Sequence, residues 1–285
     1  MPVHANFDFW PNTRPPKPKK LMRISDGDTP VIEQPIRLVS CDTPEKSRYA
    51  GGPNTAQTKL DACKNRLEDG TYDAIPQGMR EYLIEKLTND AAQKHIAAGY
   101  DATAEFDKML DLRLDRGDGT RRDVAVIPTG EIIETFGRML AYIAPWFDTR
   151  REELPDRDDP ERRTFNLQLV ETGWAAMFPI YPSLPRDDDF DKLIKAAEIA
   201  WNDQKGAWKK YGRDLLLAYE YRACVKLGTA DNATDGIEDA FKRYCVNLET
   251  LEIFDPVEFH QVPVPYRMWI WKDDLNKAKQ DLGLH

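Results

Sequence analysis

The sequence predicts an α+β fold, because short strand-like runs and longer helical patterns both recur along the chain. Strand-like runs alternate with turns in about residues 21–41, and residues 140–144 form a further short strand-like run. Apolar residues recur at helical spacing in residues 76–98 and 102–110. At 285 residues, the chain is long enough for a substantial core and for one or two domains.

The first part of the chain combines an arm, strands and a helical insertion. Residues 1–20 hold several prolines among basic residues, which predicts an extended basic arm. Two or three strands follow up to Cys41, with a bend expected at Asp26–Gly27. Gly51-Gly52-Pro53 should open a helix, and the helical patterns after it predict an inserted helical module at about residues 70–110.

The middle of the chain is expected to be mostly extended. Asp111–Asp115 alternates as a strand would. Val124–Ile127 and Ile132–Ile133 flank a Pro-Thr-Gly turn, which predicts a hairpin. Leu140–Ala144 predicts a further strand, and the alternating charges of Asp148–Arg163 predict a solvated loop.

The last part of the chain is predicted to form helices, followed by a segment rich in aromatic residues. Asn166 is expected to cap a helix that Gly173 ends, and acids at 187–189 open an amphipathic helix whose macrodipole favours them. Residues 212–285 are expected to form a C-terminal extension, with a helix at 215–227. Its aromatic run at 264–271 either stacks on bases or seals the extension onto the rest of the protein.

Composition limits the function classes. Charged residues make up 31% and hydrophobic residues 41% of the chain, as in ordinary soluble proteins. The net charge of −9 has the wrong sign for a large nucleic-acid footprint, so local Lys and Arg or a bound divalent cation would have to overcome it. No apolar run approaches a membrane span and no secretion signal is evident. The expectation is a cytoplasmic protein without a membrane partner, or a secreted one if a signal has been removed.

The cysteines give no zinc spacing. Cys41, Cys63, Cys224 and Cys245 form no C-x-x-C pair and no Cys/His pattern. Cys224 and Cys245 bracket twenty residues, so a disulfide between them is possible in an exported protein. The sequence leaves that pairing open.

Charged side chains gather on two neighbouring strand-like runs between Ile24 and Glu45. Asp28 and Asp42 are hard oxygen ligands that suit Ca²⁺ or Mg²⁺, and Glu45 could hold or deprotonate a water beside such an ion. Arg37 is an odd number of residues from Asp42, so only a bulge or bend near Ser40 and Cys41 would let the two converge. Each piece alone also fits a hairpin turn or a helix start.

Three sequence blocks in this order resemble the staphylococcal nuclease (thermonuclease) family. They are D-G-D-T at 26–29, R-x-x-x-x-D-x-P-E at 37–45 and, in place of Y-G-R-x-L-A-Y, F-G-R-M-L-A-Y at 136–142. An N-x-x-L-V-x-x-G block at 166–173 and a G-x-W block at 206–208 agree with the family too. The resemblance covers about residues 21–210, with large insertions.

The resemblance implies a five-stranded OB-fold-type barrel with packed helices. It also implies a Ca²⁺-dependent endonuclease that hydrolyses phosphodiester bonds of DNA or RNA to give 3′-phosphate ends. Ca²⁺ would be held by Asp28, Asp42 and the carbonyl of Thr43, and Glu45 would act as general base or orient the attacking water. Two arginines, Arg37 and Arg138, would bind the phosphate and stabilise the transition state.

Two positions of the substrate site depart from the family pattern. Phe136 stands where the family usually has Tyr, so a hydroxyl contact to substrate is lost, and Tyr181 is left to stack on a base. Two alternatives to a nuclease are a non-catalytic nucleic-acid-binding module of the same fold and a scaffold or toxin-like partner protein. The preference between DNA and RNA and the oligomeric state do not follow from the sequence.

Overall fold

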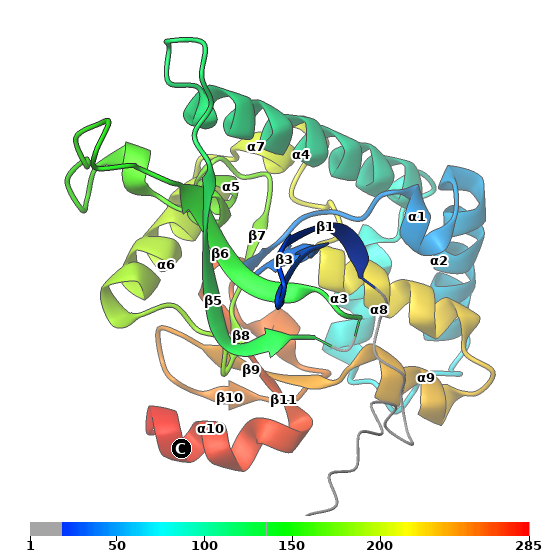
Figure 1. The fold of residues 1–285 in the computed structure, drawn as a ribbon. Helices are drawn as coiled ribbons and strands as arrows, with labels where there is room; N and C mark the ends of the chain where they lie inside the picture. Colours follow the sequence, from blue (N-terminus) through cyan, green and yellow to red (C-terminus); the bar gives the residue numbers. More distant parts are fainter. Residues whose placement is uncertain (1–18, 135, 285) are drawn as a thin grey trace, which may run out of the picture.

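The computed structural model describes residues 19–134 and 136–284 and shows a mixed α+β molecule in which helices surround several small sheets (Figure 1). The helices are α1 (Ser47–Ala50), α2 (Pro53–Glu68), α3 (Gln77–Lys86), α4 (Ala91–Leu114), α5 (Phe165–Glu171), α6 (Asp187–Asn202), α7 (Gly206–Tyr211), α8 (Ala218–Thr229), α9 (Ala233–Ala240) and α10 (Leu275–Leu282). The strands are β1 (Lys20–Asp26), β2 (Thr29–Glu33), β3 (Ile36–Leu38), β4 (Ser40–Asp42), β5 (Val124–Ile133), β6 (Met139–Pro145), β7 (Ala176–Phe178), β8 (Ile180–Tyr181), β9 (Arg243–Asn247), β10 (Ile253–Phe254) and β11 (Arg267–Trp271).

The strands do not form a barrel, so the expectation of a five-stranded OB-type barrel is wrong. In residues 19–134 and 136–284 they form four separate sheets, β1-β2, β3-β6-β5, β4-β7 and β10-β9-β11-β8, and none of them closes on itself. A barrel requires every strand to pair on both sides. Here β1 pairs only with β2, and β4 only with β7, within the described chain.

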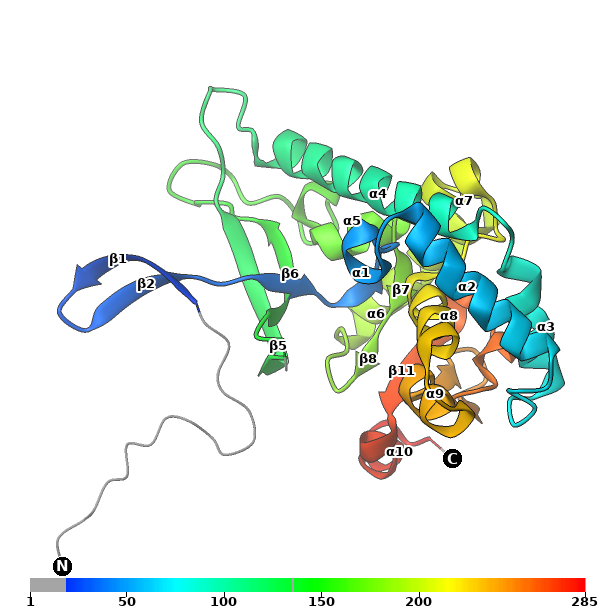
Figure 2. The same ribbon diagram turned by 90° about the vertical axis from the view of Figure 1, so that its right-hand side faces the viewer.

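The β1–β2 hairpin projects from the body of the molecule (Figure 2). Its bend falls at Asp26–Thr29, where the Asp-Gly pair predicts a turn. The apolar side chains of Leu21 and Ile24 are exposed on it. Asp28 therefore lies at the tip of an extended ribbon.

The three-stranded sheet places β6 between β3 and β5. β3 runs parallel to β6, with Arg37 opposite Leu140, and β5 runs antiparallel to β6. The strand predicted at Leu140–Ala144 is thus confirmed. The hairpin predicted at 124–133 is wrong, because these residues form the single strand β5.

The helices predicted within residues 70–110 are confirmed as α3 and α4, but α4 is longer than expected. Asp111–Asp115, predicted as a strand, lies at the end of α4. In a strand, Leu112 and Leu114 would share one face. Leu112 is 77% exposed and Leu114 only 3% exposed, as expected of residues two apart in a helix.

The module and the C-terminal segment share one core. Leu60 of α2, Leu83 of α3 and Leu227 of α8 are all fully buried in the largest apolar cluster. α8 lies directly against α2 at Gly228, where a Cβ would stand 1.9 Å from the carbonyl oxygen of Lys59. Only glycine allows so close an approach of two helices.

Helix α5 differs from the prediction at its N-terminal cap. Thr164, and not Asn166, caps α5 by accepting a hydrogen bond from the N–H of Leu167. Asn166 is buried: its amide donates to the carbonyls of Val39 and Ala141 and accepts from the N–H of Ile143. This residue therefore joins α5 to β6 and to the chain after β3.

The C-terminal segment is built into the body through the four-stranded sheet. Strand β11 pairs in parallel with β8, with Trp269 opposite Ile180, and antiparallel with β9. Arg267 and Trp269 are buried, so the middle of this aromatic run seals the segment onto the body, while Tyr266 and Trp271 at its ends are half-buried. All four cysteines are free thiols, so Cys224 and Cys245 are not bridged. No helix in the described ranges is both long enough and apolar enough to cross a bilayer.

Candidate functional site

Asp42, at the end of β4, is the centre of a buried group of charges. It is 3% exposed. Its Oδ1 accepts from Arg37 Nη2 at 2.8 Å and from Arg222 Nη1 at 3.3 Å, and its Oδ2 accepts from Arg222 Nη2 at 2.6 Å. We call Arg37, Asp42, Glu45, Arg222 and Arg243 the Asp42 cluster.

A bend in the backbone lets Arg37 and Asp42 meet. Ser40 has a φ of 60° and so adopts the left-handed conformation, which separates β3 from β4. This conformation costs a serine about 1–2 kcal/mol. A 2.6 Å hydrogen bond between the hydroxyls of Ser40 and Tyr142 holds the turn in place. The bend lies at the position where the sequence requires one for these two charges to converge.

The arginines keep Asp42 ionised. Burial alone would raise the pKa of Asp42, but Arg222, and then Arg37, outweigh it and hold that pKa below its ordinary value. Arg243 acts in the same direction from further away. The cluster holds three guanidinium groups and two carboxylates, so it carries one positive charge in excess.

Glu45 joins the cluster through Arg222. Its Oε1 accepts from Arg222 Nη1 at 2.7 Å, and its side chain is 26% exposed. The backbone N–H of Glu45 donates to Nε2 of His95 at 2.8 Å, which makes Nε2 the acceptor. Nδ1 of His95 therefore carries the proton and donates to the carbonyl of Leu216 at 2.9 Å. The neutral imidazole of His95, which stacks on the ring of Tyr221, thus holds the backbone of Glu45 in position.

The buried state of His95 predicts a sensitivity of stability to acid. Burial, assisted by Arg222 and opposed by the Leu216 bond, Asp42 and Glu220, lowers the pKa of His95 from 6.5 to about 3. The unfolded chain then binds a proton that the folded chain does not, so stability present above pH 6.5 is lost as the pH falls toward about 3. The loss is at most ~1.4 kcal/mol per pH unit.

This pH dependence can be assigned with a single substitution. His95→Gln removes the titrating group, so the free energy of unfolding from urea denaturation should depend less on pH between about pH 6.5 and pH 5. The same steep dependence in both proteins would assign the acid sensitivity to other groups.

Helix α4 is in close contact, at Gly99, with the backbone of the loop that carries Glu45. A Cβ on Gly99 would lie 2.6 Å from the carbonyl oxygen of Glu45 and 2.8 Å from that of Pro44. Gly99→Ala should therefore destabilise the protein by about 1–3 kcal/mol, although alanine normally favours a helix. Urea denaturation measures this, with Gly27→Ala as the control, because a Cβ at Gly27 meets nothing within 4 Å. A stabilised Gly99→Ala protein would contradict this close contact.

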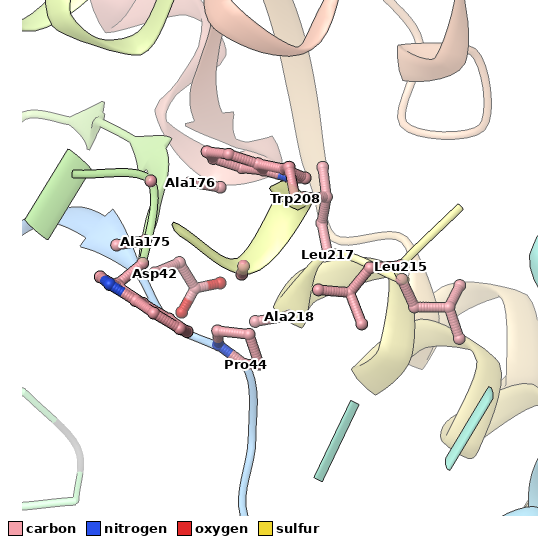
Figure 3. A pocket seen from close by; sticks show the side chains of 12 residues that line it. Asp42, Pro44, Ala175, Ala176, Trp208, Leu215, Leu217 and Ala218 are labelled. Carbon is pink, nitrogen blue, oxygen red and sulfur yellow. The ribbon is translucent and has the colours of Figure 1, made fainter. Parts of the chain in front are cut away.

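The inner side of Asp42 has no room for a nucleotide. Its carboxylate faces a cavity of about 10 Å³, and Figure 3 shows Pro44, Trp208 and Leu217 among the side chains around it. Such a volume admits one water at most. The cluster is therefore open to a ligand only from the side where Arg37, 31% exposed, and Glu45 reach solvent.

The other residues predicted for the site lie apart from the Asp42 cluster or on its edge. Asp28 is exposed at the hairpin tip and accepts a hydrogen bond from Thr29, while Thr43 simply follows Asp42. Arg138 stands just before β6, two residues before the partner of Arg37, and pairs with Glu134.

The two residues predicted to contact a nucleotide differ in exposure. Phe136 is 73% exposed and lies 5.8 Å from the Arg138 guanidinium. Tyr181 is buried, and its hydroxyl contacts Asp281 and Lys277. The expectation that Tyr181 stacks on a base does not hold in this structure.

The described residues do not fit Ca²⁺ as they are arranged. Both oxygens of Asp42 already accept from arginine, and Asp28 lies on the projecting hairpin. In the described part of the chain, no three His, Cys, Asp or Glu side chains are placed to hold a metal ion together. No step of the reaction is therefore assigned to a metal.

Sequence reasoning missed three residues of this site: His95, Arg222 and Arg243. Arg222 lies in a helix pattern and Arg243 in a strand, both in the segment outside the family resemblance. His95 belongs to the helical module and lies outside the motifs. Only the tertiary packing brings the three to Asp42, so no local signal could have found them.

The resemblance to the staphylococcal nuclease family rests on the sequence motifs alone. No protein-family model matches the chain, and no curated protein matches it significantly.

Proposed function

We propose that this protein hydrolyses phosphodiester bonds in DNA or RNA at the Asp42 cluster. The observation that carries the proposal is the convergence of Arg37, Asp42 and Glu45 in one ion-paired group that is open to solvent on one side. These are three of the residues to which the thermonuclease resemblance gives chemical roles. The resemblance to that family is itself part of the proposal.

The roles follow from the chemistry of the side chains. Arg37, partly exposed, offers parallel donors to a phosphate and can stabilise the charge that builds up in the transition state. Arg138, just before the neighbouring strand β6, is the second candidate for this role. Glu45 is the general base or the group that orients the attacking water. Asp42 holds Arg37 in place.

Cleavage of single-stranded DNA tests this proposal. Wild-type protein is incubated with end-labelled DNA in millimolar Ca²⁺ and in chelator, next to Arg37→Gln and the exposed control Arg150→Gln. The proposal expects cleavage with 3′-phosphate ends and a loss of about 10²–10³-fold in Arg37→Gln only. No cleavage in any divalent metal, by a folded protein, would reject it. Loss of cleavage in chelator would support the calcium dependence that the sequence resemblance implies.

A nucleic-acid-binding module without catalysis is the second candidate. Both oxygens of Asp42 accept hydrogen bonds from arginines, and this favours the second candidate. In such a module the Asp42 carboxylate would hold Arg37 and Arg222 in place, and the arginines would bind a phosphate. Binding of DNA without cleavage, under all metal conditions, would support this alternative.

A further inference from the structure

We propose that the Asp42 cluster is a metal-independent binding site for a single phosphodiester, in which Arg222 takes the place between Asp42 and Glu45 that a divalent cation would need, and Arg243 contacts the phosphate. The inference rests on the proposed function for the nature of the substrate. It assigns to the C-terminal segment a direct part in the site.

The position of Arg222 is the first support. Its two terminal nitrogens reach Asp42 Oδ2 at 2.6 Å and Glu45 Oε1 at 2.7 Å, so one guanidinium bridges the two carboxylates. These are the carboxylates to which the sequence resemblance assigns the metal and the water. Burial lowers and the two carboxylates raise the pKa of Arg222, with a net upward shift, so it stays charged.

The charge balance is the second support. Arg243 interacts electrostatically with Asp42, Arg37 and Arg222, so the cluster of three guanidinium groups and two carboxylates has one positive charge in excess. A dication would add two positive charges at short range from three arginines, which is strongly unfavourable away from bulk water. A phosphodiester carries one negative charge and would neutralise the excess.

Arg243 is the third support. In the described part of the chain it has no carboxylate partner, and its buried Nε lacks a hydrogen-bond acceptor. The Cζ atom of its guanidinium lies over the ring of Trp271, 4.2 Å from the ring centre, and 5.2 Å from the ring centre of Phe178. Phe178 is opposite Ser40 on the strand that pairs with β4, which puts Arg243 on the Asp42 side of the sheet. A half-buried cation beside two rings, with an Nε that lacks an acceptor, is suited to a phosphate contact.

Binding in chelator tests the inference separately from cleavage. A fluorescein-labelled oligothymidylate without terminal phosphates is titrated with the full-length protein in chelator, and fluorescence anisotropy is recorded at several salt concentrations. We expect wild-type protein to bind. Arg243→Gln should weaken binding about tenfold or more and reduce the slope of log affinity against log salt by about one. The control Arg150→Gln makes the same charge change at an exposed loop position and should change affinity less than about twofold.

Metal binding gives the second measurement. Calorimetric titration with Ca²⁺ is compared for wild-type protein and Asp42→Asn. The two titrations should be the same, because the wild-type protein binds no Ca²⁺ at Asp42. Arg222→Gln should gain such binding, because it frees Asp42 and Glu45. If Arg222→Gln does not fold, the wild-type titration and the Arg243→Gln salt slope still decide.

The outcomes separate this inference from the proposed function. Binding in chelator without any cleavage supports the inference and rejects the nuclease proposal. Cleavage by a protein that binds DNA only with Ca²⁺ overturns the inference and keeps the nuclease proposal. Unchanged affinity and salt slope in Arg243→Gln also overturn it.

Discussion

Replacement of Glu220 by glutamine is expected to lower the free energy of unfolding by about 3–5 kcal/mol, because it leaves buried cations without their counter-charge. Glu220 is fully buried in α8. Its Oε2 pairs with Lys86 Nζ at 2.8 Å and its Oε1 lies 3.4 Å from Arg267 Nη1. Burial alone would raise the pKa of Glu220, but Lys86 and then Arg267 outweigh burial and hold this pKa below its ordinary value. The carboxylate is therefore ionised.

The same residue joins three parts of the chain. Lys86 belongs to the helical module, Glu220 to α8, and Arg267 to β11. Glu220 also accepts from the hydroxyl of Tyr82 and from the N–H of Leu217 at the start of its own helix. A neutral side chain at this position would weaken all of these contacts at once.

Urea denaturation with a constant m-value measures the effect. The control is Glu85→Gln on the exposed face of α3, which should change the free energy of unfolding by less than about 0.5 kcal/mol. Adding Lys86→Met to Glu220→Gln removes one of the unpaired cations and should recover part of the loss. A Glu220→Gln protein within about 1 kcal/mol of wild type would show that water or rearrangement satisfies both cations.

The sequence predicts those parts of the site that depend on neighbours in the chain. Arg37, Asp42 and Glu45 lie within nine residues, so a single bend at Ser40 is enough to bring two of them together. The hairpin bend at Asp26–Gly27 is likewise local, since Asp and Gly favour such turns by their own backbone preferences.

The arrangement of the sheets did not follow from the sequence, for a physical reason. Whether β1 and β2 pair with another strand depends on contacts between residues far apart in the chain, and strand alternation fixes only the face of each residue. The resemblance supplied a closed barrel, but β3 and β4 have three residues each and pair with different partners, β6 and β7. Asp28 is consequently left away from Asp42.

Long-range packing also hid the cations of the site. Arg222 and Arg243 are more than 170 residues from Asp42 in the sequence, and Arg222 lies in an ordinary helix pattern. A charged residue in a helix usually faces solvent. Only the burial of α8 between α2 and the strands turns Arg222 inward, and that burial is a property of the whole core.

Replacement of Glu45 by glutamine is expected to slow cleavage about 10²–10⁴-fold, the usual contribution of a general base. Glutamine keeps the size of the side chain and an oxygen that can accept from Arg222, but it cannot take a proton from water. Because the Glu45 side chain is partly exposed, the substitution should change the free energy of unfolding by less than about 1 kcal/mol. The loss is therefore expected in the reaction and not in the fold.

Steady-state kinetics distinguish the two parts that Glu45 could play. A base acts only in the transition state, so Glu45→Gln should lower kcat and leave KM nearly unchanged. A residue that only anchors Arg222 near the phosphate would instead raise KM, because the loss would affect substrate and transition state alike. Glu33→Gln on the exposed hairpin is the matched control and should change neither constant. Wild-type kcat in Glu45→Gln would exclude Glu45 as the base and leave the arginines as the groups through which this site acts.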